Sequence, residues 1–374
     1  MKPWGKKLMI VAAAALMLIL SACGAKQSNE GSKDNTAASN QTDTTNQAAD
    51  SKPGDASLKG KKIALVMQFN TGTFSSQYIE GVKDQVGKLG GEVQVFASDN
   101  DLGKMSTNLD AAINQGFDGI LIDHGQAGAL EPGVKRAVEK KIPVVVFDAD
   151  IKVPGVTVLQ QDDKVMAEMS LEQLAADAGG KGNIVKVWVA GFAPMERRQT
   201  AYQAFQAKYP DLKEVSAFGN ANNPAMDTQA QMEAVLRKYP NKGDITAVWA
   251  AWDEFAKGAA RAIQQAGRTE IKVYGIDMSD EDLQMIQDPA SPWVASAAVD
   301  PKDIGRVQVR FLYQKFHGDQ TDDVVVLNPV FVKREDLPKA PEKVNTTQLN
   351  QYVKGWGNSD QGYTDWLKEL EASK

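Results

Sequence analysis

Residues 119–148 have the sequence GILIDHGQAGALEPGVKRAVEKKIPVVVFD, and this stretch decides the fold. Two short apolar runs, at 119–123 and 143–147, flank a longer and more polar stretch that we expect to be helical near 129–140. A strand, a helix and a second strand in this order are typical of a βαβ unit with parallel strands. Both runs are apolar without alternation, which favours strands that are buried on both faces of a sheet.

The same alternation continues on both sides of this unit and forms two series. In the first series we expect strands at 62–67, 92–97, 119–123 and 143–147, with helices at 75–89, 104–115 and 129–140. After an apolar run at 156–159, the second series has expected helices at 163–178, 196–208, 226–238 and 254–266 and strands at 184–190, 215–218, 247–250 and 271–276. Gly and Pro residues lie between the expected strands and helices, where the chain turns. The fold class predicted is therefore α/β, with two doubly wound lobes built on parallel sheets.

The N-terminus has the features of a secretory signal peptide. Three lysines lie within the first seven residues, and residues 8–20 are apolar and uncharged. This run is shorter than the roughly 20 residues of a transmembrane helix. The next residues, Leu20-Ser21-Ala22-Cys23, resemble a bacterial lipobox, in which the cysteine becomes the first mature residue and carries lipid. We expect a signal peptide at 1–22 and lipidation of Cys23; the alternative is a plain signal peptide with an incidental cysteine.

Residues 23–59 differ in composition from the remainder of the chain. They are rich in Ser, Asn, Gln, Thr, Asp and Ala and nearly free of large apolar residues. Such a segment cannot bury enough apolar surface to offset its chain entropy, so we expect a flexible tether. Two acyl chains on one residue give stable membrane anchoring. The expected location is extracytoplasmic, at the surface of the cell membrane.

Charge and motif content argue against several classes of function. The chain has 42 basic and 48 acidic residues and no basic cluster, which argues against binding to nucleic acid. Its two histidines lack the spacing of metal ligands, so we expect no metal. It has no thiol after Cys23, no Gly-x-Ser-x-Gly motif, and neither a Walker A nor a Gly-x-Gly-x-x-Gly fingerprint. We therefore expect a binding protein without a cofactor rather than an enzyme.

Candidate site residues follow the predicted strands, because ligands of open parallel sheets bind beyond the carboxyl ends of the strands. Carboxylates, amides, an arginine pair and aromatic rings are found there. Hydroxyl groups need donors and acceptors, and rings cover the apolar C–H face of a sugar, so this set predicts a sugar or polyol site. The candidate ligand-binding residues are Thr71, Phe74, His124, Asp148, Arg198, Asn223, Trp252 and Asp277.

Several candidates also have a purely structural explanation. Asp148 and Asp277 are suited to capping helices, and Trp252 to packing in the core. Asn223 precedes a proline and is suited to beginning a turn. A lone histidine such as His124 is usually satisfied by its neighbours. These alternatives remain open at the level of sequence.

Residues from about 60 to 335 resemble the ribose-binding branch of the type I periplasmic binding proteins. The matching segments, in order, are 63–66 with Phe74, 142–148, 196–198 with Tyr202, 247–267 and 273–277. The resemblance implies two lobes that close on a sugar by bending at a hinge. It also implies that Phe74, Asp148, Arg198 and Asp277 contact the sugar.

The resemblance further implies three crossings between the lobes, which we place near Gln160, Val299 and Pro329. The N-terminal lobe is then expected to contain 60–160 and 300–328, and the C-terminal lobe 161–299 and 329–345. Residues 346–374 extend past the usual end of the family, and we expect the stretch 348–374 to pack as a terminal helix.

Three positions depart from the family pattern, and each departure removes a polar group. Ala149 stands where an arginine is usual, Trp252 where an asparagine is usual, and Val299 where glutamine is common. These changes favour another pentose, a hexose or a linear polyol over ribose.

The resemblance implies a monomeric solute-binding protein that delivers its ligand to the permease of an ABC importer. The alternative is a sensory binding protein that delivers ligand to a membrane receptor or a histidine kinase, which would share the same sequence features.

Overall fold

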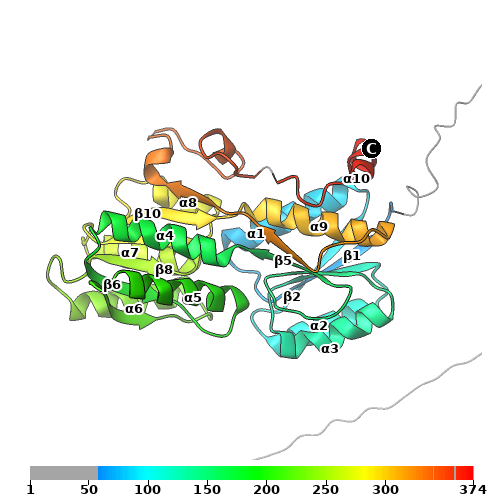
Figure 1. Cartoon of the computed structure of the whole chain (residues 1–374), viewed down its shortest axis with the longest axis horizontal. Helices are drawn as coiled ribbons and strands as arrows, with labels where there is room; N and C mark the ends of the chain where they lie inside the picture. The colour runs from blue at the N-terminus through cyan, green and yellow to red at the C-terminus, as the bar shows by residue number, and fades with distance from the viewer. Residues whose placement is uncertain (1–57, 340, 358, 374) are drawn as a thin grey trace, which may run out of the picture. The chain divides into compact units, whose positions relative to one another are not determined.

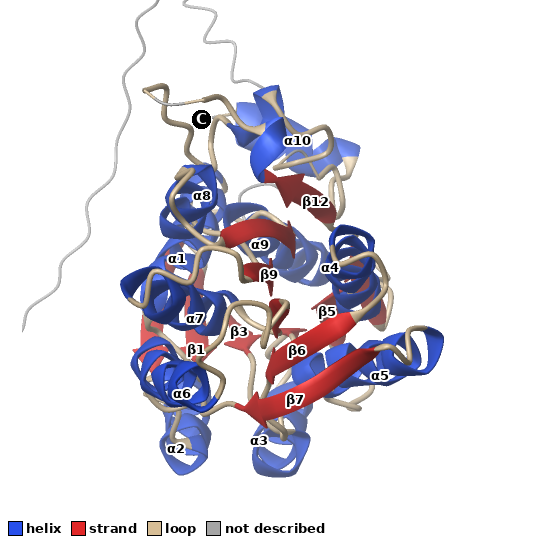
Figure 2. Ribbon diagram, turned by 90° about the vertical axis from the view of Figure 1, so that its left-hand side faces the viewer, coloured by secondary structure: helices blue, strands red, loops and turns tan. Residues whose placement is uncertain are grey.

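Two six-stranded sheets, each with helices on both faces, make up the protein (Figure 1, Figure 2). The computed structural model describes residues 58–339, 341–357 and 359–373. The expected signal peptide, Cys23 and most of the expected tether lie outside these residues. Among the described residues, none of the helices has the length and apolar character needed to span a membrane.

The first sheet has the order β11-β5-β4-β3-β1-β2, and all its neighbouring strands are parallel. Helices α1 and α9 pack together on one face, and α2 and α3 on the other. The elements of this lobe are β1 (Lys62–Met67), α1 (Gly72–Lys88), β2 (Glu92–Ala97), α2 (Leu102–Asn114), β3 (Gly119–Asp123), α3 (Ala127–Glu139), β4 (Val144–Phe147), β5 (Thr157–Gln161), α9 (Pro301–His317) and β11 (Val324–Leu327).

The second sheet has the order β12-β10-β9-β8-β6-β7, in which β12 alone pairs antiparallel, with β10. Helices α4 and α5 pack against each other, as do α6 and α7 (Figure 2). Its elements are α4 (Asp163–Asp177), β6 (Gly182–Val187), α5 (Ala193–Lys208), β7 (Leu212–Phe218), α6 (Pro224–Lys238), β8 (Ala247–Ala250), α7 (Asp253–Gln265), β9 (Lys272–Ile276), α8 (Asp280–Gln287), β10 (Trp293–Ala298) and β12 (Val330–Lys333).

The continuous apolar runs are explained by cores on both faces of the first sheet. In β1, Ile63 and Leu65 belong to the core under α1 and α9, while Ala64 and Val66 belong to the core under α2 and α3. Successive side chains of a strand point to opposite faces, so a strand with two covered faces has no polar positions to alternate with. The predicted α/β class with two parallel-sheet lobes is confirmed.

The chain passes between the two sheets three times, after β5, after β10 and between β11 and β12. Beyond β12, the C-terminal segment packs on both lobes. Val344, Leu349 and Trp356 belong to the core of the second lobe, whereas Leu367 and Leu370 belong to that of the first.

The prediction of a terminal helix over 348–374 is wrong in extent. The structure has a short 3₁₀ turn, η3 (Leu349–Gln351), and an α-helix, α10 (Asp365–Ala372), separated by irregular chain. Gly355, Gly357 and Gly362 have φ values of 91°, 66° and 74°. These left-handed conformations interrupt a right-handed helix, and the segment follows the surface of both lobes instead.

Candidate functional site

A pocket lies between the two lobes at the carboxyl ends of their strands. It contains about 740 Å³ of empty space, a volume that includes space open to solvent. Six of the eight predicted residues line it, namely Thr71, Phe74, His124, Arg198, Trp252 and Asp277. Asp148 is buried directly behind the pocket, and Asn223 lies in a neighbouring groove.

Three of these residues leave their strands in the same unusual backbone conformation. His124, Asp148 and Asp277 follow β3, β4 and β9 directly, with φ values of 59°, 53° and 72°. Residues other than glycine rarely adopt positive φ, although Asp, Asn and His tolerate it best. Backbone strain of this kind concentrates at functional sites, where surrounding contacts hold it in place. Neither aspartate occupies the N-cap position of a helix, so capping does not explain them.

Arg198 is buried and fixed by several acceptors. Its Nε donates to Asp163 Oδ1 at 2.8 Å, and its terminal nitrogens lie 3.3 Å from each carboxylate oxygen of Asp277. It also donates to the carbonyl oxygen of Ala251 at 2.7 Å. Burial alone lowers the pKa of Arg198, but Asp277 and Asp163 raise it above its ordinary value. The guanidinium is thus a permanent, pre-positioned donor group.

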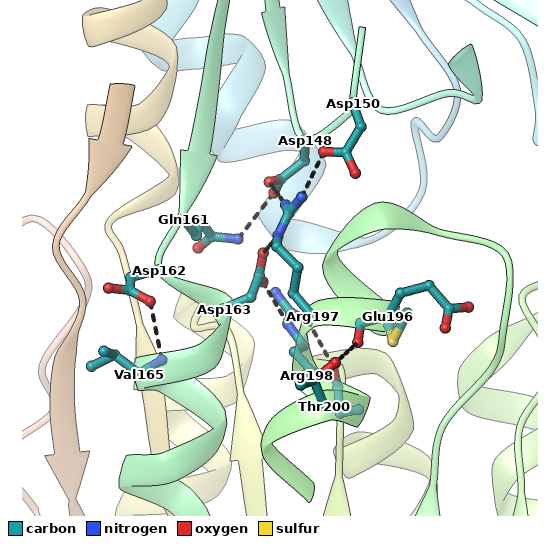
Figure 3. Close-up of polar contacts among 12 residues, drawn as sticks. Asp148, Asp150, Gln161, Asp162, Asp163, Val165, Glu196, Arg197, Arg198 and Thr200 are labelled. Atoms are coloured by element: carbon teal, nitrogen blue, oxygen red, sulfur yellow. Dashed lines mark hydrogen bonds and ion pairs between the residues drawn. The ribbon is translucent and has the colours of Figure 1, made fainter. Parts of the chain in front are cut away.

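Arg197, the neighbouring residue on α5, connects the two lobes (Figure 3). It bonds to Asp148 Oδ1 and Asp150 Oδ1 of the first lobe, both at 2.9 Å, and to Asp163 Oδ2 of the second lobe at 2.7 Å. The arginine pair is visible in the sequence, but only Arg198 is a predicted site residue. Both arginines bond to Asp163, but consecutive residues on a helix face different directions, so Arg197 reaches the first lobe and Arg198 reaches Asp277.

Gln161 is a site residue that the sequence does not predict. It is the last residue of β5, is buried, and its Nε2 lies 3.4 Å from both Asp148 Oδ2 and Asp277 Oδ1. Its Oε1 is buried and has no hydrogen-bond partner in the structure. Buried polar atoms almost always have a partner, so this oxygen is placed to accept a hydrogen bond from a bound ligand. Gln161 also lines the pocket.

Two groups beside the pocket have strongly shifted pKa values. Burial lowers the pKa of His124, but Asp123, 2.9 Å from its Nδ1, and then Asp148 raise it to about 9. Burial and the nearby Asp163 raise the pKa of Asp148 to about 7, although His124 and Arg197 oppose this shift. Positive and negative side chains therefore lie side by side at the pocket, and neighbouring charges rather than solvent stabilise each charged group.

Aromatic rings form a cluster at the pocket. The ring centroid of Phe69 lies 5.7 Å from His124, 5.6 Å from Phe192 and 5.7 Å from Trp252. Trp252 both packs against the core of the second lobe and lines the pocket, and its contact with a ligand stays a prediction. Phe69 and Phe192 follow β1 and β6, the position that predicts site residues, but they are not among the predicted set.

Asn223 lies at the N-cap of α6 without a side-chain cap bond and with a φ of 51°. It lines a groove beside the pocket together with Asn100 and Asn222, whose side chains bond across the lobes at 2.8 Å. This position matches the turn before Pro224. The structure places Asn223 near the pocket mouth rather than in the pocket.

Four carboxylates surround the buried amine of Lys257 next to the pocket. The distances to its Nζ are 2.6 Å from Glu254, 3.2 Å from Asp282, and 3.4 Å from both Asp253 and Glu281. The positive charge of Lys257 offsets part of the negative charge of these four carboxylates. Across the part of the chain that is described, no cluster of His, Cys, Asp and Glu residues is arranged to hold a metal ion.

Comparison with known proteins finds relatives that are solute-binding or sugar transport proteins. The profile of the periplasmic binding protein domain matches residues 63–320. A sugar ABC transporter structure from Yersinia enterocolitica has 40% identity and a TM-score of 0.82, covering 86% of this chain and 97% of its own. The 5-methylthioribose transporter solute binding protein from Thermotoga lettingae, solved with 5-methylthioribose, has 34% identity and a TM-score of 0.80, covering 84% and 99%. The xylitol-binding protein of Mycolicibacterium smegmatis is 30% identical over 74% of this chain and 72% of its own.

Proposed function

The chain belongs to the periplasmic binding protein domain family, and from this premise we propose that it is the extracytoplasmic solute-binding component of an ABC importer for a small sugar or polyol. The relative at 40% identity is named as a sugar ABC transporter, and the relative at 34% identity was solved with 5-methylthioribose. A relative at 30% identity is named for xylitol. A sensory role is less well supported, because these structural relatives are transport proteins.

The observation that carries this proposal is the polar group around Gln161. Its unpartnered Oε1 is an acceptor, Arg198 is a fixed donor, and the carboxylate of Asp277 is a strong acceptor within the same pocket. A hydroxyl group is at once a donor and an acceptor, so neighbouring hydroxyls of one ligand match this set. The rings of Phe74 and Trp252 then cover C–H surface.

Closure of the two lobes by bending at the crossings is the proposed mechanism. We propose the lobe boundaries 60–160 with 300–328 and 161–299 with 329–345, which the sheet membership of the strands supports. The residues proposed to bind the ligand are Thr71, Phe74, His124, Asp148, Arg198, Trp252 and Asp277, with Asn223 near the mouth and with Gln161 added from the structure. Ligand that touches both lobes stabilises the closed form over the open form.

The proposal also includes attachment to the cell membrane through lipid on Cys23, with 1–22 removed as a signal peptide. The lipobox-like sequence and the polar composition of 23–59 support it. We propose that the protein acts as a monomer, that a membrane permease receives the ligand, and that the protein itself performs no catalysis.

The test is a ligand screen by thermal unfolding. The chain without 1–22, and with Cys23→Ser to prevent lipidation, is heated with pentoses, hexoses, polyols, amino acids and nucleosides. A ligand that binds only the folded state adds about 2.7 kcal/mol of stability at 100 times its Kd. We expect a clear shift with a sugar or polyol that is lost in Asp277→Ala and kept in Lys208→Ala, which changes an exposed residue outside the pocket. A shift with amino acids or nucleosides alone would overturn the proposed ligand class.

A further inference from the structure

The pocket has two ends with different chemistry. Its inner end lies at the first crossing, where Gln161 ends β5 and approaches Asp277, which in turn contacts Arg198. The unpartnered Oε1 of Gln161 lies at this end. The hydroxyl groups of a ligand therefore find the most hydrogen-bond partners at this inner end, next to the hinge.

The outer end is marked by the four residues that the pocket shares with the neighbouring groove at the mouth, namely Phe69, Thr71, Ala221 and Glu254. Here the ring of Phe69 contacts the rings of Phe192 and Trp252, so apolar surface from both lobes meets. The groove beyond also contains Met226, whose exposed fraction is 76%. We call Phe69, Phe192 and Trp252 the aromatic collar.

Polar side chains near the collar are largely engaged with their own neighbours. Asp253 and Glu254 pair with the buried amine of Lys257, at 3.4 and 2.6 Å. His124 pairs with Asp123 at 2.9 Å. Trp252 also stands where an asparagine is usual in the family that the sequence resembles, so an amide has been replaced by a ring. A hydroxyl pressed against this collar loses bonds to water without full replacement, whereas an apolar group gains from burial.

Given the proposed function, on which this inference rests, we infer that the ligand is a sugar or polyol that carries an apolar substituent, such as a methyl or alkylthio group, at the end that faces the mouth. The hydroxyl groups lie at Gln161, Arg198 and Asp277, and the substituent lies within the aromatic collar. A substituent longer than methyl extends toward the groove that contains Met226.

Matched ligand pairs test this inference. The Kd values of D-ribose and 5-methylthioribose, and of D-galactose and 6-deoxy-D-galactose, are measured by calorimetry on the chain that starts at residue 23 with Cys23→Ser. We expect the apolar member of at least one pair to bind at least tenfold more tightly than its partner. Equal or tighter binding by the hydroxylated members overturns the inference and leaves the proposed function standing. A lack of binding by every sugar, in these pairs and in the wider screen, overturns the proposed function itself.

Substitutions in the aromatic collar test whether these rings cause the preference for an apolar substituent. In Trp252→Asn, which restores an amide, and separately in Phe69→Leu, we expect the ratio of the two Kd values to fall to about one third or less of its original value. Tyr352→Leu removes an exposed ring that lines neither the pocket nor the groove, and as the control it leaves the ratio unchanged. A ratio that survives in both folded collar variants shows that the collar does not select the substituent, and so contradicts the inference.

Discussion

Gln161 shows what a single side chain contributes to the proposed site. Its Oε1 is buried without a partner, so replacing it removes no hydrogen bond from that atom in the ligand-free protein. We expect Gln161→Leu to weaken ligand binding about tenfold or more, because a bond to a ligand hydroxyl is lost. We also expect a lower unfolding temperature, because the bonds from Nε2 to Asp148 and Asp277 are lost. Calorimetry and thermal unfolding measure the two effects. Gln160→Leu, on the opposite face of the strand, is the control. Equal losses of affinity in both variants would contradict the assigned role.

His124 should make stability depend on pH. Its pKa in the folded protein is about 9, against 6.5 for the free side chain, because Asp123 and Asp148 favour the charged ring. A raised histidine pKa adds stability that is complete below about pH 6.5 and is lost as the pH rises through 9. We expect the unfolding temperature to fall between these values, and to fall less in His124→Gln. The same slope in both proteins would show that His124 remains neutral.

Residues that directly follow an apolar strand could be predicted, whereas residues placed by distant contacts could not. Asp148 and Asp277 come immediately after their strands, and both are at the pocket. The apolar run before Gln161 ends at Leu159, but pairing with β11, more than 150 residues away, continues the strand for two polar residues. Arg197 acts across the lobes, and nothing in its local sequence distinguishes it from Arg198.

Helices α1 and α9 pack so closely that glycine is required where they cross. A methyl group on Gly305 would lie 2.5 Å from the carbonyl oxygen of Tyr78, and one on Gly81 would lie 2.1 Å from that of Lys302. These contacts are with backbone, which cannot rotate away. We expect Gly305→Ala to lower the free energy of unfolding by about 1–3 kcal/mol through overpacking. Chemical denaturation measures this, with Gly128→Ala of α3, where a methyl group meets open space, as the control. Similar stability of the two variants would argue against this packing.

The helices and strands from 62 to 276 could be predicted from local pattern, while those after 276 could not. Helix α9 is buried along most of its length, including the polar residues Gln308, Arg310 and Gln314. The C-terminal segment covers it: Arg310 donates to the carbonyl oxygen of Ser359, and Gln314 to that of Gly362. The polar residues of α9 are therefore covered by a segment more than 40 residues further along the chain, a contact that local sequence does not reveal.

At the level of the whole molecule, Arg197 is expected to raise ligand affinity by stabilising the closed arrangement of the two lobes. Its ion pairs with Asp148 and Asp150 join the two lobes, and the open form would have to separate them. We expect Arg197→Ala to raise the Kd about three- to tenfold. The difference from the unmodified protein should shrink in part at high salt, because the pair with exposed Asp150 is screened, whereas the pair with buried Asp148 is screened much less. Calorimetry at two salt concentrations tests this. Lys208→Ala removes an exposed cation from the same helix and leaves the Kd unchanged. An Arg197→Ala protein with unaltered affinity would show that these pairs do not favour closure.

The distance between the lobes, with and without ligand, is the measurement that tests closure around a sugar or polyol most directly. Spin labels are attached at Lys135→Cys of α3 and Gln203→Cys of α5, two exposed positions on different lobes, with Cys23→Ser. Pulsed EPR then gives the distribution of distances between the labels. We predict that a saturating sugar or polyol, chosen by the thermal screen, replaces a broad distribution with a single narrow one, and that Asp277→Ala abolishes this change. An unchanged distribution at saturation would contradict binding by closure of the two lobes.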